Sequence, residues 1–295
     1  MSASRGLDRP VAEPRSLIAP AWGWYLLFFL VPLGFIVLYA FAMNDPNRFF
    51  VVRFGLQTAQ FERLWDPIYL RIYLDTLVMA LSGTIGCLVI GYPFAYFIAT
   101  KVRQHRTLLL LLVIVPFWTS LLIRTYAWVI ILGEQGPLSE FLQRIRVLSN
   151  PLNILYTPTA VWIGVVYDYL PLMVFPLYVT LERLDRTLIE ASRDLGEGKW
   201  GTFRRVTLPM TLSGVMTGCL LTFIPMMGEY VVPEILGGAK SFLVGSLVAN
   251  QILTAGDWPF GAALAMGLII VLLLVIVAYL RVVGRRAEEN LGAAL

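Results

Sequence analysis

The stretch Pro259–Leu280 has the sequence PFGAALAMGLIIVLLLVIVAYL and contains no charged residue. As a helix, these residues would be about 33 Å long at a rise of about 1.5 Å per residue. The hydrocarbon core of a bilayer is about 30 Å thick and is crossed by about 20 apolar helical residues. The stretch therefore predicts a transmembrane helix.

Five further segments have a similar length and apolar character. They are Ala21–Ala42, Thr76–Thr100, Thr107–Gly133, Pro158–Leu181 and Thr207–Gly228. Of the 295 residues, 58% are hydrophobic and 14% are charged, a balance that a soluble domain of this size could not bury. We therefore expect an all-α membrane protein with six transmembrane helices in residues 21–282.

The basic residues predict the orientation of these helices. With the N-terminus in the cytoplasm, 15 of the 23 Lys and Arg residues fall in cytoplasmic segments, seven fall outside, and Arg124 lies within a span. Because cytoplasmic loops carry the excess of Lys and Arg, we expect the N-terminal tail (residues 1–20) and the C-terminal tail (283–295) to be cytoplasmic. The largest internal loop then covers residues 183–207.

That loop contains most of a polar stretch, Leu184–Pro209, with the sequence LDRTLIEASRDLGEGKWGTFRRVTLP. Apolar residues recur in its first part every three or four positions, which predicts an amphipathic helix. These residues are Leu184, Leu188, Ala191 and Leu195. Gly196 and Gly198 then permit a sharp turn, and a second short helix is expected at roughly Lys199–Arg205. Such a helical pair is suited to docking into a groove on a partner; the alternative is a solvated connector without a partner.

The residues around this turn resemble the EAA loop of ABC importer permeases. Glu190-Ala191-Ser192 is followed by Gly196 and then by Leu208-Pro209 at the spacing of that motif. Serine stands for its second alanine, and Val206 stands for its isoleucine. The resemblance implies the fold of an ABC type I importer permease, whose loop contacts an ATPase. The coupling residues that it implies are Glu190, Ala191, Ser192, Asp194, Leu195 and Gly196.

Three further stretches resemble the spermidine/putrescine permeases within that family. They are Pro116–Trp128 (PFWTSLLIRTYAW), Gly228–Gly238 (GEYVVPEILGG) and Asp257–Phe260 (DWPF). The resemblance implies that the chain is a multi-pass protein of a bacterial-type inner membrane and the first of two permease subunits. It implies a polyamine as substrate. It also implies a second homologous permease subunit, two ATP-binding subunits and an extracytoplasmic solute-binding protein. ATP and Mg would bind to the ATPase partners, and this chain is expected to bind no cofactor.

Other functions fit only fragments of the sequence. The nearest match to a nucleotide-binding loop, Gly237–Ser241, lacks the glycine directly before its lysine, so we expect no enzymatic activity in this chain. Asp168 and Asp257 resemble parts of the aspartyl dyad of an intramembrane protease, but Asp257 lies outside the apolar runs. A proton- or ion-coupled secondary transporter stays open as an alternative. No cluster of His, Cys and carboxylates predicts a metal site, and the scattered basic residues predict no binding of nucleic acid.

Charged and aromatic residues in the spans are the candidates for a substrate pathway. Asp168 lies near the middle of the fourth span, where a charge costs at least ~2.5–3.5 kcal/mol and usually faces a cavity or a partner. Carboxylates and aromatic faces attract cations. The candidates are Asp168, Tyr167, Trp118, Glu229 and Tyr230. Two alternatives stay open: Asp168 is the partner of Arg124, and Glu229 is a solvated helix end close to bulk water.

Overall fold

The computed structural model describes residues 15–44, 52–55, 57–102, 104–238 and 241–292. Within these ranges, four helices are long and apolar enough to cross a membrane: Pro20–Ala40, Pro67–Thr100, Pro158–Glu182 and Trp258–Arg281. There are also two bent pairs of helices, and the total is six spans if each pair counts as one span. The pairs are Arg106–Trp118 with Leu121–Arg144 and Lys199–Met210 with Leu212–Met227. The fold is therefore an all-helical membrane fold, and the count of six spans stays a prediction.

The elements follow one another in this order. The first half comprises α1 (Arg15–Tyr25), the π-helical turn η1 (Leu26–Leu30), α2 (Val31–Ala40), the antiparallel strands β1 (Met43–Asn44) and β2 (Val52–Arg53), α3 (Ala59–Leu64), α4 (Pro67–Thr100), α5 (Arg106–Ile114), the 3-10 turn η2 (Pro116–Trp118), α6 (Leu121–Leu132) and α7 (Pro137–Arg144). The second half comprises α8 (Pro158–Glu182), α9 (Arg186–Asp194), α10 (Lys199–Thr202), the π-helical turn η3 (Phe203–Thr207), α11 (Leu208–Met210), α12 (Leu212–Met227), α13 (Val231–Gly237), α14 (Val244–Leu253) and α15 (Trp258–Gly292).

The predicted span Thr107–Gly133 is not one continuous helix. The chain leaves helical geometry at Thr119, and the two halves of the span meet at an angle of 97°. Pro116 has no backbone N–H to donate and so favours a break at this point. The Thr119 hydroxyl donates to the Pro116 carbonyl oxygen at 2.6 Å, which satisfies a backbone group at the break. The predicted span is therefore a pair of helices joined at a bend.

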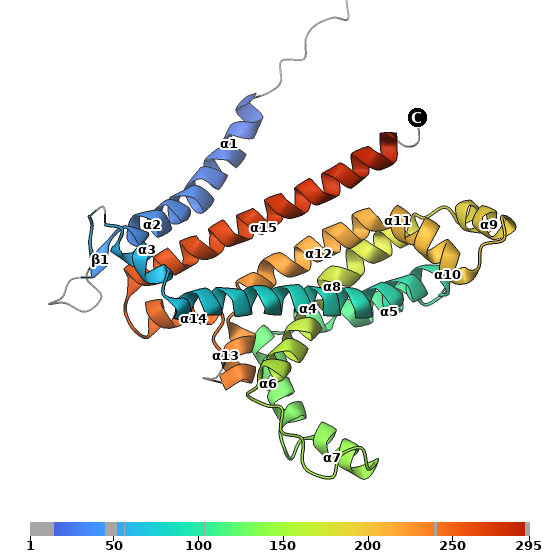
Figure 1. Ribbon diagram of the computed structural model, residues 1–295, viewed down its shortest axis with the longest axis horizontal. Helices are drawn as coiled ribbons and strands as arrows, with labels where there is room; N and C mark the ends of the chain where they lie inside the picture. The colour runs from blue at the N-terminus through green and yellow to red at the C-terminus, as the bar shows by residue number, and fades with distance from the viewer. Residues whose placement is uncertain (1–14, 45–51, 56, 103, 239–240, 293–295) are drawn as a thin grey trace, which may run out of the picture.

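The buried core lies where α4, α8 and α12 pack against one another (Figure 1). Small residues let these helices approach closely, as is usual in membranes. A Cβ at Gly86 of α4 would lie 2.5 Å from the Trp162 ring of α8. A Cβ at Gly214 of α12 would lie 2.8 Å from the backbone oxygen of Pro176 in α8. Glycine at both positions therefore sets the distance between the core helices.

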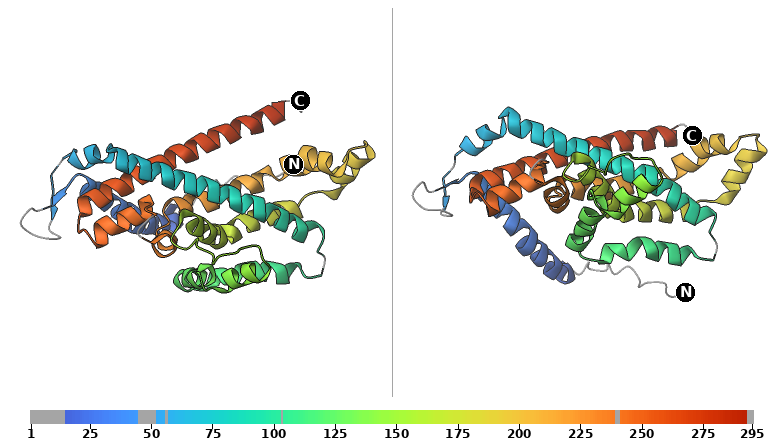
Figure 2. Two further views of the ribbon diagram at one scale, coloured as in Figure 1. Left: turned by 60° about the horizontal axis from the view of Figure 1, so that its bottom comes forward. Right: turned by 90° about the horizontal axis from the view of Figure 1, so that it is seen from below.

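The other elements surround this core. α15 packs against α2 and α14, while α9 and α10 project from one end and α6 with α7 projects to one side (Figures 1 and 2). α15 continues as a helix to Gly292, so the predicted tail 283–295 is largely helical. Most of the predicted tail 1–20 lies outside the described residues, which begin at Arg15.

We predict that Gly214→Ala destabilises the protein although alanine favours helices. The added Cβ meets the Pro176 carbonyl oxygen, which cannot move without moving α8, and overpacking of this kind costs about 1–3 kcal/mol. Gly228→Ala at the end of the same helix is the matched control, because its Cβ meets nothing closer than 3.9 Å. Thermal unfolding of the purified variants in detergent measures the difference. Equal midpoints for the two variants would contradict the packing assigned to α8 and α12.

Candidate functional site

Residues 183–207 form a compact projection, which we call the 183–207 knob. It contains α9 and α10, so the predicted pair of short helices is confirmed, although α10 ends at Thr202 and η3 carries the chain onward. Asp185 caps α9 by accepting a hydrogen bond from the Thr187 backbone nitrogen at 2.9 Å. Hydrogen bonding to Thr187 lowers the pKa of Asp185 from its ordinary value, so this cap stays ionised at neutral pH.

Gly196 makes the turn between the two helices, as predicted. Its φ is 87°, in the left-handed region where a residue with a Cβ is strained. Its amide donates to the carbonyl of Arg193 at 2.9 Å, and the Glu197 amide donates to the carbonyl of Ser192 at 3.2 Å. These two bonds are the Schellman pattern that ends a helix at a left-handed glycine. The turn therefore depends on glycine at this position.

Ser192 holds the two helices of the knob together. Its side chain is buried, and its hydroxyl donates to the Thr202 hydroxyl of α10 at 3.2 Å. An alanine at position 192 could not make this bond. The serine that departs from the EAA motif therefore has a structural role in the knob.

Several apolar residues of the knob lie on its outside. Leu188 and Ala191 are exposed, and Leu195 has 86% of its surface accessible. Trp200 is 74% exposed and stacks on Phe203, with ring centroids 5.4 Å apart. Glu190 and Asp194 are exposed as well. Large apolar groups of this kind on a polar projection are typical of a surface that binds another protein.

A polar cavity of about 260 Å³ lies between the knob and the ends of α4 and α8. Glu190 and Arg193 line one side, and Lys101 and Glu182 line the opposite side. Arg106 also borders it, with its guanidinium 3.3 Å from the Glu182 carboxylate. This ion pair connects the start of α5 to the end of α8, directly beside the knob.

Asp168 and Arg124 form an ion pair inside the molecule. The guanidinium and carboxylate lie 3.2 Å apart, and the two side chains are 11% and 3% exposed. The bend before α6 places Arg124 against α8, with its guanidinium 5.6 Å from the Phe117 ring centre. Both Asp168 oxygens and the Arg124 Nε have no hydrogen-bond partner among the described residues. The alternative in which Asp168 is the partner of Arg124 is the arrangement found.

Glu229 is not a solvated helix end, and that alternative is wrong. It is only 6% exposed and accepts a hydrogen bond from the Tyr169 hydroxyl at 2.5 Å. Its other oxygen accepts from the backbone nitrogens of Val231 at 2.9 Å and Val232 at 3.3 Å. α13 begins at Val231, two residues after Glu229, so the carboxylate satisfies amides that have no partner within that helix. The segment after α12 folds back on the core instead of entering bulk water.

The predicted aromatic residues do not gather around these acids. The Tyr167 ring packs edge-on against Trp128, with centroids 5.3 Å apart. Trp118 is largely exposed beside the break before α6, and Tyr230 is exposed after α12. The structure thus joins Asp168, Arg124, Tyr169 and Glu229 in one region, and it leaves Trp118 and Tyr230 on the surface.

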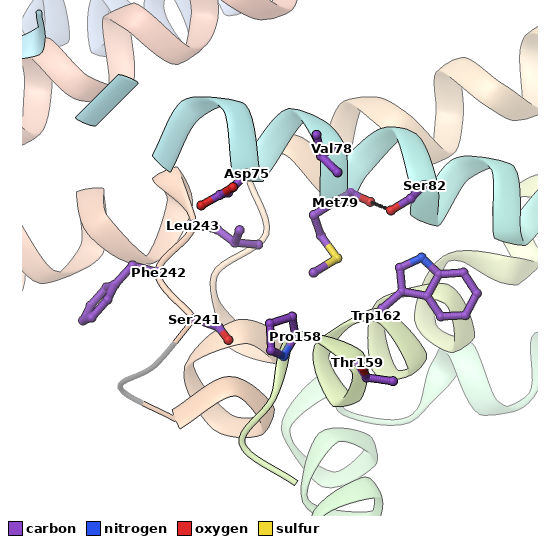
Figure 3. A pocket seen from close by; sticks show the side chains of 10 residues that line it. All are labelled: Asp75, Val78, Met79, Ser82, Pro158, Thr159, Trp162, Ser241, Phe242 and Leu243. Carbon is purple, nitrogen blue, oxygen red and sulfur yellow. Dashed lines mark hydrogen bonds between the residues drawn. The ribbon is translucent and has the colours of Figure 1, made fainter. Parts of the chain in front are cut away.

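Asp75 is an acid that the hydropathy pattern missed. The predicted span began at Thr76, but α4 begins at Pro67, with Asp66 as its cap. Asp75 therefore lies inside the helix and lines a cavity of about 520 Å³ (Figure 3). The sequence Asp66-Pro67 is the signal that could have located the helix start, because proline is favoured in the first turn after a capping aspartate.

The geometry does not support an aspartyl dyad. Asp168 pairs with Arg124, whereas Asp257 lies 3.0 Å from Arg63 and accepts hydrogen bonds from Asn44 at 3.0 Å and from the Phe260 amide at 3.1 Å. Among the residues the structure describes, no group of three His, Cys, Asp or Glu side chains could hold a metal ion. The lookalike of a nucleotide-binding loop includes residues 239–240, which lie outside the described ranges.

Known proteins resemble this chain over nearly its whole length. Residues 17–287 match the family described as binding-protein-dependent transport system inner membrane component. The spermidine/putrescine transport system permease protein PotB of Escherichia coli K12 is 45% identical over 265 residues, which cover 90% of this chain and 96% of PotB. The protein of the same name from Haemophilus influenzae is 40% identical and covers 90% of this chain and 92% of its own.

Two solved structures resemble the fold. A bacterial ABC transporter involved in the import of the acidic polysaccharide alginate contains a chain with a TM-score of 0.71 at 14% identity, covering 92% of this chain and 94% of that one. The MetNI methionine ABC transporter contains a chain with a TM-score of 0.53 at 21% identity, covering 73% and 94%. The chain thus has the fold of ABC importer permeases, and it belongs to the family of binding-protein-dependent transport system inner membrane components.

Proposed function

We propose that this chain is a permease subunit of an ATP-driven polyamine importer, with the 183–207 knob as its contact to an ATPase. The outward position of Leu188, Leu195 and Trp200 on the knob is the observation that carries the ATPase contact. The importer would also contain a second homologous permease subunit, two ATP-binding subunits and an extracytoplasmic solute-binding protein. In this arrangement residues 21–282 form six spans in a bacterial-type inner membrane, and both termini are cytoplasmic.

The knob is suited to transmitting motion as well as to binding. Ser192 and the Gly196 turn hold α9 and α10 in one geometry, so the knob can move as a unit. α11 connects it to α12, which packs directly on α8. A displacement of the knob by an ATPase would therefore reach the core helices. The motif residues Glu190, Ala191, Ser192, Asp194, Leu195 and Gly196 all lie on this projection.

The substrate follows from the relatives. Two relatives at 45% and 40% identity are named as spermidine/putrescine permeases, and this chain spans almost their whole length. A polyamine crosses as a cation with two or more charges, so carboxylates and aromatic faces are needed to replace part of its hydration. Asp168, Glu229, Tyr167, Tyr230 and Trp118 are acids and aromatic residues of this kind in or beside the spans.

We predict that Gly196→Ala weakens binding of the ATPase, whereas Gly198→Ala does not. Left-handed backbone costs a residue with a Cβ about 1–2 kcal/mol, which corresponds to a change in population of about fivefold or more. Gly198 has an ordinary φ of −73°, and a Cβ at either glycine meets nothing within 4 Å. Only Gly196→Ala therefore introduces left-handed backbone strain, while Gly198→Ala changes the N-cap residue of α10. Recovery of the ATPase on purified permease measures the effect.

Membrane insertion of both variants is expected to be normal, because the knob lies outside the spans. Equal recovery of the ATPase with Gly196→Ala and Gly198→Ala would remove the basis for assigning the knob as the docking site.

We predict that Asp168→Asn depletes the assembled complex, because it leaves Arg124 charged and unpaired in the interior. Breaking a buried ion pair by removing one partner costs about 3–5 kcal/mol. The double variant Arg124→Met with Asp168→Leu removes both charges and is expected to recover the complex. Uptake of labelled putrescine and spermidine per assembled complex is then measured for the wild type and both variants.

A transport role for Asp168 predicts a different result from a purely structural role. If Asp168 contacts the substrate, uptake per complex stays low in the double variant although the complex is recovered. If its role is structural, uptake per complex returns toward the wild-type level. Absence of putrescine and spermidine uptake in the wild-type complex would overturn the polyamine assignment and leave the permease family intact.

A further inference from the structure

A cavity of about 520 Å³ opens between α4, the first turns of α8 and the segment 241–243. In Figure 3, Asp75, Met79 and Ser82 of α4 lie on one side, and Pro158 and Trp162 of α8 lie opposite them. Ligand sites for small molecules have volumes of about 300–1,000 Å³ and combine apolar walls with a few polar groups. This cavity has that size and that composition.

Among the described residues that line the cavity, Asp75 is the one carboxylate. No described residue forms an ion pair or hydrogen bond with its side chain, and the residue is exposed. It lies eight residues after Pro67, about 12 Å along the helix axis. Since α4 is about 51 Å long and the hydrocarbon core is about 30 Å thick, Asp75 lies close to the boundary of that core. Water can reach a carboxylate there, so it stays available to an incoming cation.

The opposite walls are fixed by hydrogen bonds beside Asp75. The Thr76 hydroxyl accepts from the Val244 backbone nitrogen at 2.9 Å and donates to the Ile72 carbonyl at 2.7 Å. The bond from Val244 holds the end of the segment 241–243 against α4. The hydroxyl oxygen of Ser241 is buried at the cavity edge without a hydrogen-bond partner in the described structure. The bond between Thr76 and Val244 therefore gives the cavity a firm frame.

The other acids considered for the pathway are already engaged. Asp168 pairs with Arg124 at 3.2 Å, and Glu229 accepts bonds from Tyr169 and from the start of α13. Asp75 has no such contact among the described residues. In the proposed orientation it also lies toward the outer end of α4, where a substrate released by an external binding protein would arrive.

We propose that this cavity is an outer binding site for one end of a linear alkyl amine, with its ammonium group on the Asp75 carboxylate. The methylene chain lies along Met79 and packs on the surface of the Trp162 ring. One carboxylate neutralises one ammonium, so the other amino groups of the substrate contact residues outside this cavity. This site rests on the proposed polyamine transport and names the group that first receives the amine.

The test uses the complete complex with its ATPase, second permease and binding protein in proteoliposomes. Asp75→Asn keeps the shape of the side chain and removes its charge, and Asp75→Glu keeps the charge. Glu62→Gln removes an exposed carboxylate from α3, outside the cavity. We expect Asp75→Asn to raise the KM for spermidine uptake about 10-fold, as for loss of one charged hydrogen bond. Asp75→Glu is expected to recover part of that loss, and Glu62→Gln to leave the KM unchanged.

A second readout covers the case in which Asp75→Asn does not assemble. Met79→Cys introduces a thiol into the cavity wall, and spermidine is expected to slow its modification by a water-soluble maleimide. Spermidine uptake by the wild type with an unchanged KM in Asp75→Asn would overturn this site alone, as would modification of Met79→Cys at the same rate with and without spermidine. No uptake of spermidine or putrescine by the wild type would overturn the proposed function and this site with it.

Discussion

Every backbone N–H and C=O group within the hydrocarbon layer needs a partner in the protein, because lipid offers none. Continuous helices meet this requirement along α4, α8 and α15. Where a helix bends or breaks, hydroxyl groups add hydrogen bonds to the backbone carbonyls. The Thr119 hydroxyl bonds to the Pro116 carbonyl at the break before α6. At the 65° bend before α12, the Thr211 hydroxyl bonds to the Thr207 carbonyl and to the Tyr92 hydroxyl, both at 2.8 Å.

These satisfied breaks position the functional regions. The break before α6 turns Arg124 toward Asp168, and the bend before α12 directs the 183–207 knob out from the end of the core. Between them, glycines such as Gly86 and Gly214 keep α4, α8 and α12 close enough to move together. The buried ion pair between Arg124 and Asp168 costs free energy because both charges lose their hydration. We therefore attribute to it the specific placement of α6 against α8, and not a gain in stability.

Much of this arrangement could be predicted from the sequence, because long apolar runs and a left-handed glycine leave local signals. The span ending at Thr100 and the turn at Gly196 are examples. Bends leave weaker signals in the sequence. Pro116 indicates that the helix breaks, but it does not indicate that the two halves meet at 97°. Burial of Glu229 could not be predicted, because it results from α13 folding back on the core. Asp75 was missed because the apolar run begins only at Thr76, whereas the helix extends as far as its backbone bonds are made, from Pro67 onward.

The source of energy separates the proposed importer from a proton- or ion-coupled transporter of the same general architecture. A chain that depends on a partner ATPase transports only when that partner hydrolyses ATP. The most direct measurement is spermidine uptake by proteoliposomes holding the complete complex, with no ion gradient and with a protonophore present. The account predicts uptake with ATP and none with a non-hydrolysable ATP analogue. Uptake that needs a proton gradient and proceeds without ATP would contradict it.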